Sequence, residues 1–149
     1  MRIYADTSFL VELLYKGATH HITTRQFFTR HAEAEWITTE WLQFEVSNTL
    51  RQLCLYQPGI KPAQAEALRR LLKHWHARGN FVFEETNLSE AVKEAMQLSA
   101  ATATKLRMRS ADVLHVALLE QINPDLFVTR DKDQYKLAVS RALKSQLLP

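Results

Sequence analysis

Short apolar runs alternate along this chain with longer segments of helical periodicity, and this alternation restricts the fold more than any other feature. The runs span residues 1–5, 35–38, 81–83 and 126–129. Their length and apolar character predict strands, and the segments between them are long enough for helices. Strands that alternate with helices indicate an α/β fold in which helices cover both faces of a parallel sheet.

The segment after residue 38 shows the helical pattern most clearly. Leu42, Val46 and Leu50 recur every four residues, which places them on one buried stripe of a helix that Thr39 can cap. The residues expected to end this helix are Pro58, Gly59 and Pro62. Further helices are expected after a cap at Thr7 or Ser8, over 20–31, over 63–78, after a cap at Asn87 or Ser89, and from Ser110 onward.

We expect a single domain over residues 1–149, because a chain of this length with 46% hydrophobic side chains can build one core. No Ser- or Pro-rich stretch, charge block or internal repeat divides it. The single cysteine, Cys54, excludes an internal disulfide and a cysteine metal cluster. Asp6 and Glu12 interrupt the apolar N-terminal stretch, and no run approaches the roughly 18 apolar residues of a membrane span. The sequence therefore predicts a soluble cytoplasmic protein.

Three aspartates occupy positions where catalytic groups of α/β proteins gather. Asp6 and Asp131 follow predicted strands, and Asp112 follows the expected cap Ser110 by two residues. The carboxyl ends of parallel strands meet at one edge of the sheet, where ligands bind. The first turn of a helix favours a carboxylate because the N-terminal end of the helix dipole is positive. We therefore expect the three side chains to share one crevice.

Glu45 is the fourth candidate acid. It precedes the stripe residue Val46, so it flanks the buried face of its helix, and its long side chain can reach the crevice. Clustered carboxylates repel one another, which raises their pKa values unless a cation lies among them. Oxygen ligands select hard cations such as Mg²⁺ or Mn²⁺, which can activate water and stabilise charge on a phosphate. The acids therefore indicate hydrolysis of nucleic acid.

The positive charge of the chain suits a polyanionic partner. The net charge is +3 and the sequence pI is about 9.1, values too small to establish such a partner. The basic residues beside the candidate acids are Lys105, Arg107, Arg109, Arg130 and Lys132. The stretch 105–109 is compatible with an RNA-contacting surface and equally with a solvated loop.

The histidines do not form a recognisable metal site. His115 follows Asp112 by three residues and shares its helical face, so it can contact the site or merely pack beside it, and we expect packing. The pairs at positions 20 and 21 and at 74 and 76 point in different directions on helices, so they cannot ligate one ion together.

Four segments resemble the acidic motifs of PIN-domain nucleases, in the order and at the spacing of that family. They are residues 3–10 (IYADTSFL), 39–50 (TEWLQFEVSNTL), 110–119 (SADVLHVALL) and 127–133 (FVTRDKD). Each motif is weak by itself, whereas four in order on an alternating strand–helix pattern are specific. Within the family, the size and motifs are most similar to VapC-type toxins of bacterial and archaeal toxin–antitoxin pairs. The resemblance covers almost the whole chain.

The resemblance implies a PIN-like, flavodoxin-like three-layer sandwich with a central parallel sheet, and Mg²⁺- or Mn²⁺-dependent endonucleolytic cleavage of RNA. By motif position Asp6, Asp112 and Asp131 would hold the metal, and Glu45 would complete the catalytic set or orient water. The hydroxyl groups that match family positions supporting these carboxylates belong to Thr7, Ser8 and Thr129. The implied partners are an RNA substrate, a small antitoxin that covers the active site, and a second copy in a homodimer.

Two positions stay ambiguous. Asp133 is either an additional acid of the site or the cap of a short helix that begins at Gln134. Residues 139–149 depart from the usual pattern of the family, in which a final edge strand is expected, because LKSQLL fits a strand or a helix.

Acids on such a sheet also occur in three other kinds of protein. Phosphotransferases with an aspartate nucleophile usually carry a second acid two residues on, where this chain has Ser8. A receiver domain needs an aspartate after its third strand, where this chain has Glu84 and Glu85. A PIN-like domain that does not cleave and serves as a binding or scaffold module is the remaining alternative, and divalent-metal binding would distinguish it from a nuclease.

Overall fold

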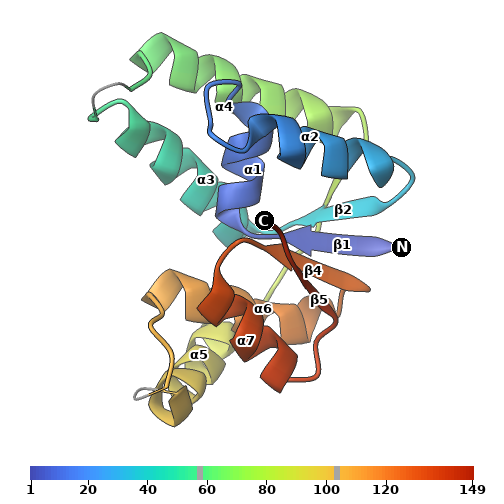
Figure 1. Ribbon diagram of the computed structural model, residues 1–149, viewed down its shortest axis with the longest axis vertical. Helices are drawn as coiled ribbons and strands as arrows, with labels where there is room; N and C mark the ends of the chain where they lie inside the picture. The colour runs from blue at the N-terminus through green and yellow to red at the C-terminus, as the bar shows by residue number, and fades with distance from the viewer. Residues whose placement is uncertain (57–58, 103–104) are drawn as a thin grey trace.

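The computed structural model describes residues 1–56, 59–102 and 105–149, and these form a five-stranded sheet flanked by helices (Figure 1). The elements follow the order β1 (Arg2–Ala5), α1 (Thr7–Leu14), α2 (His21–Arg30), β2 (Glu35–Thr38), α3 (Glu40–Leu53), α4 (Pro62–Ala77), β3 (Phe81–Phe83), α5 (Leu88–Thr102), α6 (Ser110–Ile122), β4 (Leu126–Thr129), α7 (Lys132–Ser140) and β5 (Ser145–Leu147). The α/β expectation is confirmed. None of the helices in these ranges is long and apolar enough to cross a membrane.

The sheet has the strand order β3-β2-β1-β4-β5, and every neighbouring pair is parallel. Strand β1 lies at the centre, where Ile3 pairs with Trp36 on one side and Leu126 on the other. The chain builds β1, β2 and β3 outward in one direction and then returns to place β4 on the opposite side of β1. Such a reversal opens a crevice at the carboxyl ends of the two strands between which it occurs. The crevice therefore lies at the ends of β1 and β4.

Helices cover both faces of the sheet and make the three layers that the sequence predicted. Helices α1 to α4 lie above the sheet in Figure 1, and α5, α6 and α7 lie below it. Helices α3 and α4 pack against each other, as do α5 and α6. The predicted stripe of α3 is buried, and the Thr39 hydroxyl accepts a hydrogen bond from Leu42 N at 3.2 Å. Pro58, one of the residues expected to end that helix, lies outside the described ranges.

Two predicted helix caps are wrong. The cap of α1 is Asp6, not Thr7 or Ser8: its Oδ1 accepts a hydrogen bond from Phe9 N at 2.9 Å. Asp6 is the residue with extended backbone angles, as a cap requires, whereas Thr7 is already helical. Ser110 is likewise the first residue of α6 and not its cap. The conclusion that Asp112 occupies the first turn of α6 still holds.

Both ambiguities at the C-terminal end are resolved. Asp131 caps α7, with Oδ1 accepting hydrogen bonds from Asp133 N and Gln134 N at 2.8 Å each. Asp133 is therefore not the cap, and its carboxylate accepts a hydrogen bond from Arg107 N at 3.2 Å. Residues Ser145–Leu147 form the edge strand β5, parallel to β4.

Candidate active site

A cavity of about 600 Å³ opens at the carboxyl ends of β1 and β4, and all four predicted acids line it. Asp6 follows β1 and Asp131 follows β4, while Glu45 enters from α3 and Asp112 from the first turn of α6. Side chains that lie far apart in the sequence thus meet where the strand order reverses. The predicted convergence of these four residues in one crevice agrees with the structure.

Asp6 is buried and held by hydrogen bonds to both of its carboxylate oxygens. Ser8 Oγ donates to Oδ1 at 2.7 Å, beside the bond from the backbone of α1. Thr129 Oγ1 lies 2.8 Å from Oδ2 and 2.7 Å from Gln134 Oε1. A hydroxyl has one proton, so Thr129 donates to one of these acceptors at a time. The side chain of Asp6 therefore has a defined orientation, and two of the hydroxyls expected to support the carboxylates contact it.

Gln134 is a site residue that the sequence reasoning missed. Its side chain is 1% exposed, and its Nε2 lies 3.3 Å from the backbone oxygen of Asp112. It thereby connects α7 to the first turn of α6. A signal was available, because Gln134 falls on the same helical stripe as the buried residues Leu137 and Ala138.

Glu45 is half-buried on α3, and one of its two oxygens carries the hydrogen bonds. Thr7 Oγ1 donates to Oε2 at 2.6 Å, and His115 Nε2 lies 2.5 Å from the same oxygen. Burial raises the pKa of Glu45, but the hydrogen bond and charge of His115 and the hydrogen bond of Thr7 outweigh burial, so the pKa is lowered. Glu45 is consequently ionised at neutral pH.

The expectation that His115 only packs beside the site is wrong. Its side chain is 2% exposed, and Nδ1 lies 2.7 Å from the hydroxyl of Tyr4 on β1. One turn of α6 separates it from Asp112, and its two ring nitrogens contact side chains of β1 and α3. Burial therefore brings the imidazole into contact with Glu45 instead of removing it from the site.

Asp112 and Asp131 influence each other across the cavity. Burial raises the pKa of Asp112, the hydrogen bond from Arg109 N at 2.9 Å opposes this, and the charge of Asp131 raises it further. The net shift is upward. A carboxyl whose pKa is raised by burial, and further by a neighbouring carboxylate, is one whose charged form a bound cation would stabilise.

The cations around the site play different parts. Arg107 and Arg109 are exposed and line the cavity, as an RNA-contacting surface requires. Arg130 also lines it, but its guanidinium donates to Glu12 Oε2 and Thr24 Oγ1, each at 2.8 Å. The Arg130 and Glu12 side chains are only 12% and 15% exposed. Arg130 therefore links α1, α2 and β4, which its sequence position beside Asp131 did not indicate.

Arg130→Gln is expected to destabilise the protein by about 1–3 kcal/mol, because it leaves the Glu12 carboxylate largely buried without its cation. Lys93→Gln is the matched control, since Lys93 and Glu90 form an ion pair whose side chains are 64% and 57% exposed. Its loss should cost less than about 1 kcal/mol. Urea unfolding measures both free energies, and equal losses would show that the Arg130 pair is no more than a surface contact.

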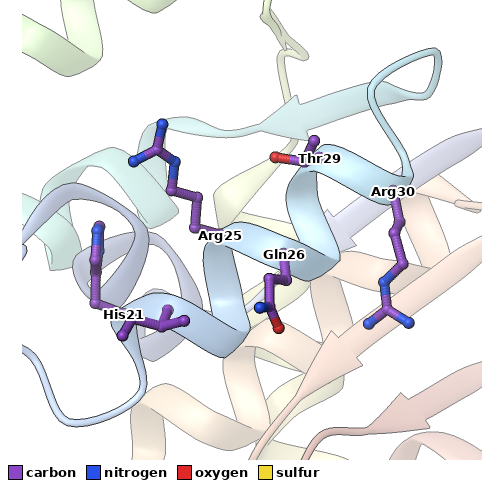
Figure 2. A pocket seen from close by; sticks show the side chains of 6 residues that line it. His21, Arg25, Gln26, Thr29 and Arg30 are labelled. Atoms are coloured by element: carbon purple, nitrogen blue, oxygen red, sulfur yellow. The ribbon is translucent and has the colours of Figure 1, made fainter.

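A second cavity of about 610 Å³ follows the exposed side of α2 (Figure 2). Figure 2 shows Arg25 and Thr29 on one side of the helix and Gln26 and Arg30 on the other. None of the described residues that line this cavity is a carboxylate. The predicted acids gather in the first cavity, so that cavity is the candidate active site.

The carboxylate oxygens that line the first cavity are the type of ligand that a hard cation prefers. Within residues 1–56, 59–102 and 105–149, no group of three or more His, Cys, Asp or Glu side chains is positioned to hold one ion together. Mg²⁺ does not need such a cage, because it keeps several waters and uses one or two carboxylates with substrate phosphates. Asp112 and Asp131, whose charges repel, meet that smaller requirement.

Comparisons with known proteins agree with the fold. The family model described as PIN domain matches residues 3–140. No curated protein matches the chain in sequence.

Three solved structures are similar to this one. Mycobacterium tuberculosis VapC20, described as a sarcin–ricin loop cleaving toxin, is 15% identical with a TM-score of 0.67, over 89% of this chain and 92% of its own. Rickettsia felis VapBC2, bound to a promoter DNA fragment, is 12% identical with a TM-score of 0.67 over all of both chains. Neisseria gonorrhoeae FitAcB is 12% identical with a TM-score of 0.59, over 96% of this chain and 95% of its own. At these identities the likeness establishes the fold alone.

Proposed function

Because the chain belongs to the PIN domain family, we propose that it is a metal-dependent endoribonuclease that hydrolyses RNA phosphodiester bonds. The observation that carries the proposal is the meeting of Asp6, Glu45, Asp112 and Asp131 in one cavity that Arg107 and Arg109 also line. Acids beside cations suit the hydrolysis of a phosphodiester, because the reaction needs both an activated water and neutralisation of phosphate charge. We propose further that residues 1–149 form a single PIN domain.

Asp6, Asp112 and Asp131 are the proposed ligands of Mg²⁺ or Mn²⁺. Because no three of the described acids surround one point, one or two of them would contact the ion at a time, and waters and substrate phosphate would complete its shell. The ion, when bound, supplies a water of lowered pKa and positive charge beside the phosphate. The hydroxyls of Ser8 and Thr129 fix the orientation of the Asp6 carboxylate at the cavity. Glu45, ionised because its pKa is lowered, accepts a hydrogen bond from the attacking water and orients it.

The test is cleavage of a structured RNA mixture by the purified chain with Mg²⁺ or Mn²⁺, compared with the same reaction in EDTA. The expected result is cutting that depends on the metal. Cutting that persists in EDTA would overturn the metal requirement. Metal binding without cutting would favour the scaffold alternative.

Arg107 and Arg109 would contact the RNA backbone rather than take part in the chemistry. The double variant Arg107→Ala/Arg109→Ala is expected to raise KM for RNA with little change in kcat. Two lost phosphate contacts should also reduce the slope of log affinity against log salt by about 1.4, at about 0.7 per contact with single strands. Arg25→Ala/Arg30→Ala on α2 is the matched control, because these arginines line the other cavity. An equal loss in both variants would mean that binding reflects net charge alone.

We propose as partners a small antitoxin and a second copy of the chain, as in the toxin role of a toxin–antitoxin pair. Names of the similar structures, VapBC2 and FitAcB, support a two-protein system. Large exposed apolar side chains, among them Phe44, Leu55 and Met96 at 60%, 69% and 69%, are available for such contacts. Light scattering gives the mass of the isolated chain in solution, and a monomer at all concentrations would exclude the homodimer.

A further inference from the structure

We infer that His115 is a positioning residue of the proposed nuclease, which holds Oε2 of Glu45 from within α6 and leaves Oε1 for the water in the cavity. The inference rests on the proposed function. The inference is based on two consecutive side-chain contacts of His115. Tyr4 Oη lies 2.7 Å from His115 Nδ1, and His115 Nε2 lies 2.5 Å from Glu45 Oε2. These contacts join β1, α6 and α3, the elements that meet at the cavity.

The direction of the hydrogen bonds follows from the chemistry of Tyr4. Burial raises the pKa of this phenol, so it keeps its proton and can donate to Nδ1. An imidazole that is neutral and accepts at Nδ1 carries its proton on Nε2, and a charged imidazole carries protons on both nitrogens; in either form the Nε2 proton is donated to Glu45 Oε2. Tyr4 thus selects the tautomer with which His115 can hold the carboxylate.

Both donors to Glu45 act on one oxygen. Thr7 Oγ1 donates to Oε2 at 2.6 Å, beside the bond from His115. Among the contacts of the described residues, Oε1 accepts no hydrogen bond. A glutamate side chain that samples several rotamers loses conformational entropy when it is ordered on binding. Two fixed donors orient it before the substrate arrives, which removes that cost. The contacts therefore favour a role in positioning over one in packing.

Two amide substitutions separate these roles. His115→Gln places an amide nitrogen near the position of Nε2 and keeps a donor for Glu45, whereas His115→Asn places one near Nδ1 and keeps a partner only for Tyr4. We expect His115→Asn to lower kcat by about 10- to 100-fold with little change in KM, as loss of a supporting contact does at metal sites. His115→Gln should stay within a few fold of the wild type. A packing role predicts instead that activity follows melting temperature in both variants.

A double-mutant cycle tests whether His115 acts through Glu45. In the Glu45→Gln background, His115→Asn should lower kcat no further, because the group it positions is already lost. An unchanged kcat in His115→Asn alone, or the same fall in both backgrounds, would overturn the inference. Failure of the wild type to cut RNA would instead overturn the nuclease proposal.

The contact itself is checked by NMR independently of cleavage. The Nε2–H resonance of His115 should shift in Glu45→Gln and stay in place in Glu40→Gln, a control on the same helix whose Oε1 accepts from Thr86. A resonance that does not respond to Glu45→Gln would overturn the positioning contact.

Discussion

Asp6→Asn should reduce metal-dependent RNA cleavage by about 10³-fold or more and leave the protein folded. The substitution removes the negative charge of a proposed metal ligand. Charge stabilisation by a bound metal contributes several kcal/mol to the transition state, and each 1.36 kcal/mol corresponds to a tenfold change in rate. Its amide oxygen can still accept from Phe9 N and so keep the α1 cap. Thr129 can accept from the new amide and turn its own proton to Gln134 Oε1, which lies 2.7 Å away.

The comparison with Asp6→Ala separates catalysis from folding. The alanine variant also loses the helix cap, which should cost about 1 kcal/mol in the free energy of unfolding. Both variants should be inactive, and only the alanine variant should unfold at clearly lower urea. Cleavage by Asp6→Asn within tenfold of the wild type would remove Asp6 from the catalytic set.

Asp112→Asn should reduce the rate of RNA cleavage by about 10²-fold or more. It should also stabilise the metal-free protein at neutral pH. The folded protein binds the Asp112 proton more tightly than the unfolded chain does, because burial and the charge of Asp131 raise its pKa. The stability that this proton contributes is present below the ordinary pKa of 3.8 and is lost as pH rises through the raised value. A neutral amide does not undergo this loss.

The measurement is urea unfolding of wild type and Asp112→Asn in EDTA across the acid range and at pH 7. Their difference should be small at low pH and should grow in favour of the variant as pH rises. Added Mg²⁺ should reduce or reverse it, because an ion that binds only the folded wild type stabilises it. A variant that is less stable than the wild type at pH 7 in EDTA would contradict the raised pKa.

The strands and the acids at their ends could be predicted because they depend on local properties of the chain. Apolar runs and helical spacing identified β1 and β4, and the parallel arrangement placed Asp6 and Asp131 at one edge. The first-turn position of Asp112 follows from the same local pattern. Asn87 Oδ1 also accepts from Glu90 N at 3.1 Å, as its predicted capping role requires.

The contacts of His115 and Arg130 could not be predicted, because they join residues far apart in sequence. Glu45 and His115 are 70 positions apart, and Arg130 and Glu12 are 118 apart. Spacing on one helix shows which side is buried, but not which polar partner the neighbouring element offers. Tertiary folding brought His115 of α6 into contact with Tyr4 of β1 and Glu45 of α3, and the packing of α1 beside β4 paired Arg130 with Glu12.

Local sequence thus determined the α/β order of this chain and the edge of the sheet where its acids lie. Tertiary structure alone decided that His115 holds Glu45 and that Arg130 pairs with Glu12, because burial forces each polar group to find a partner on whichever element packs against it.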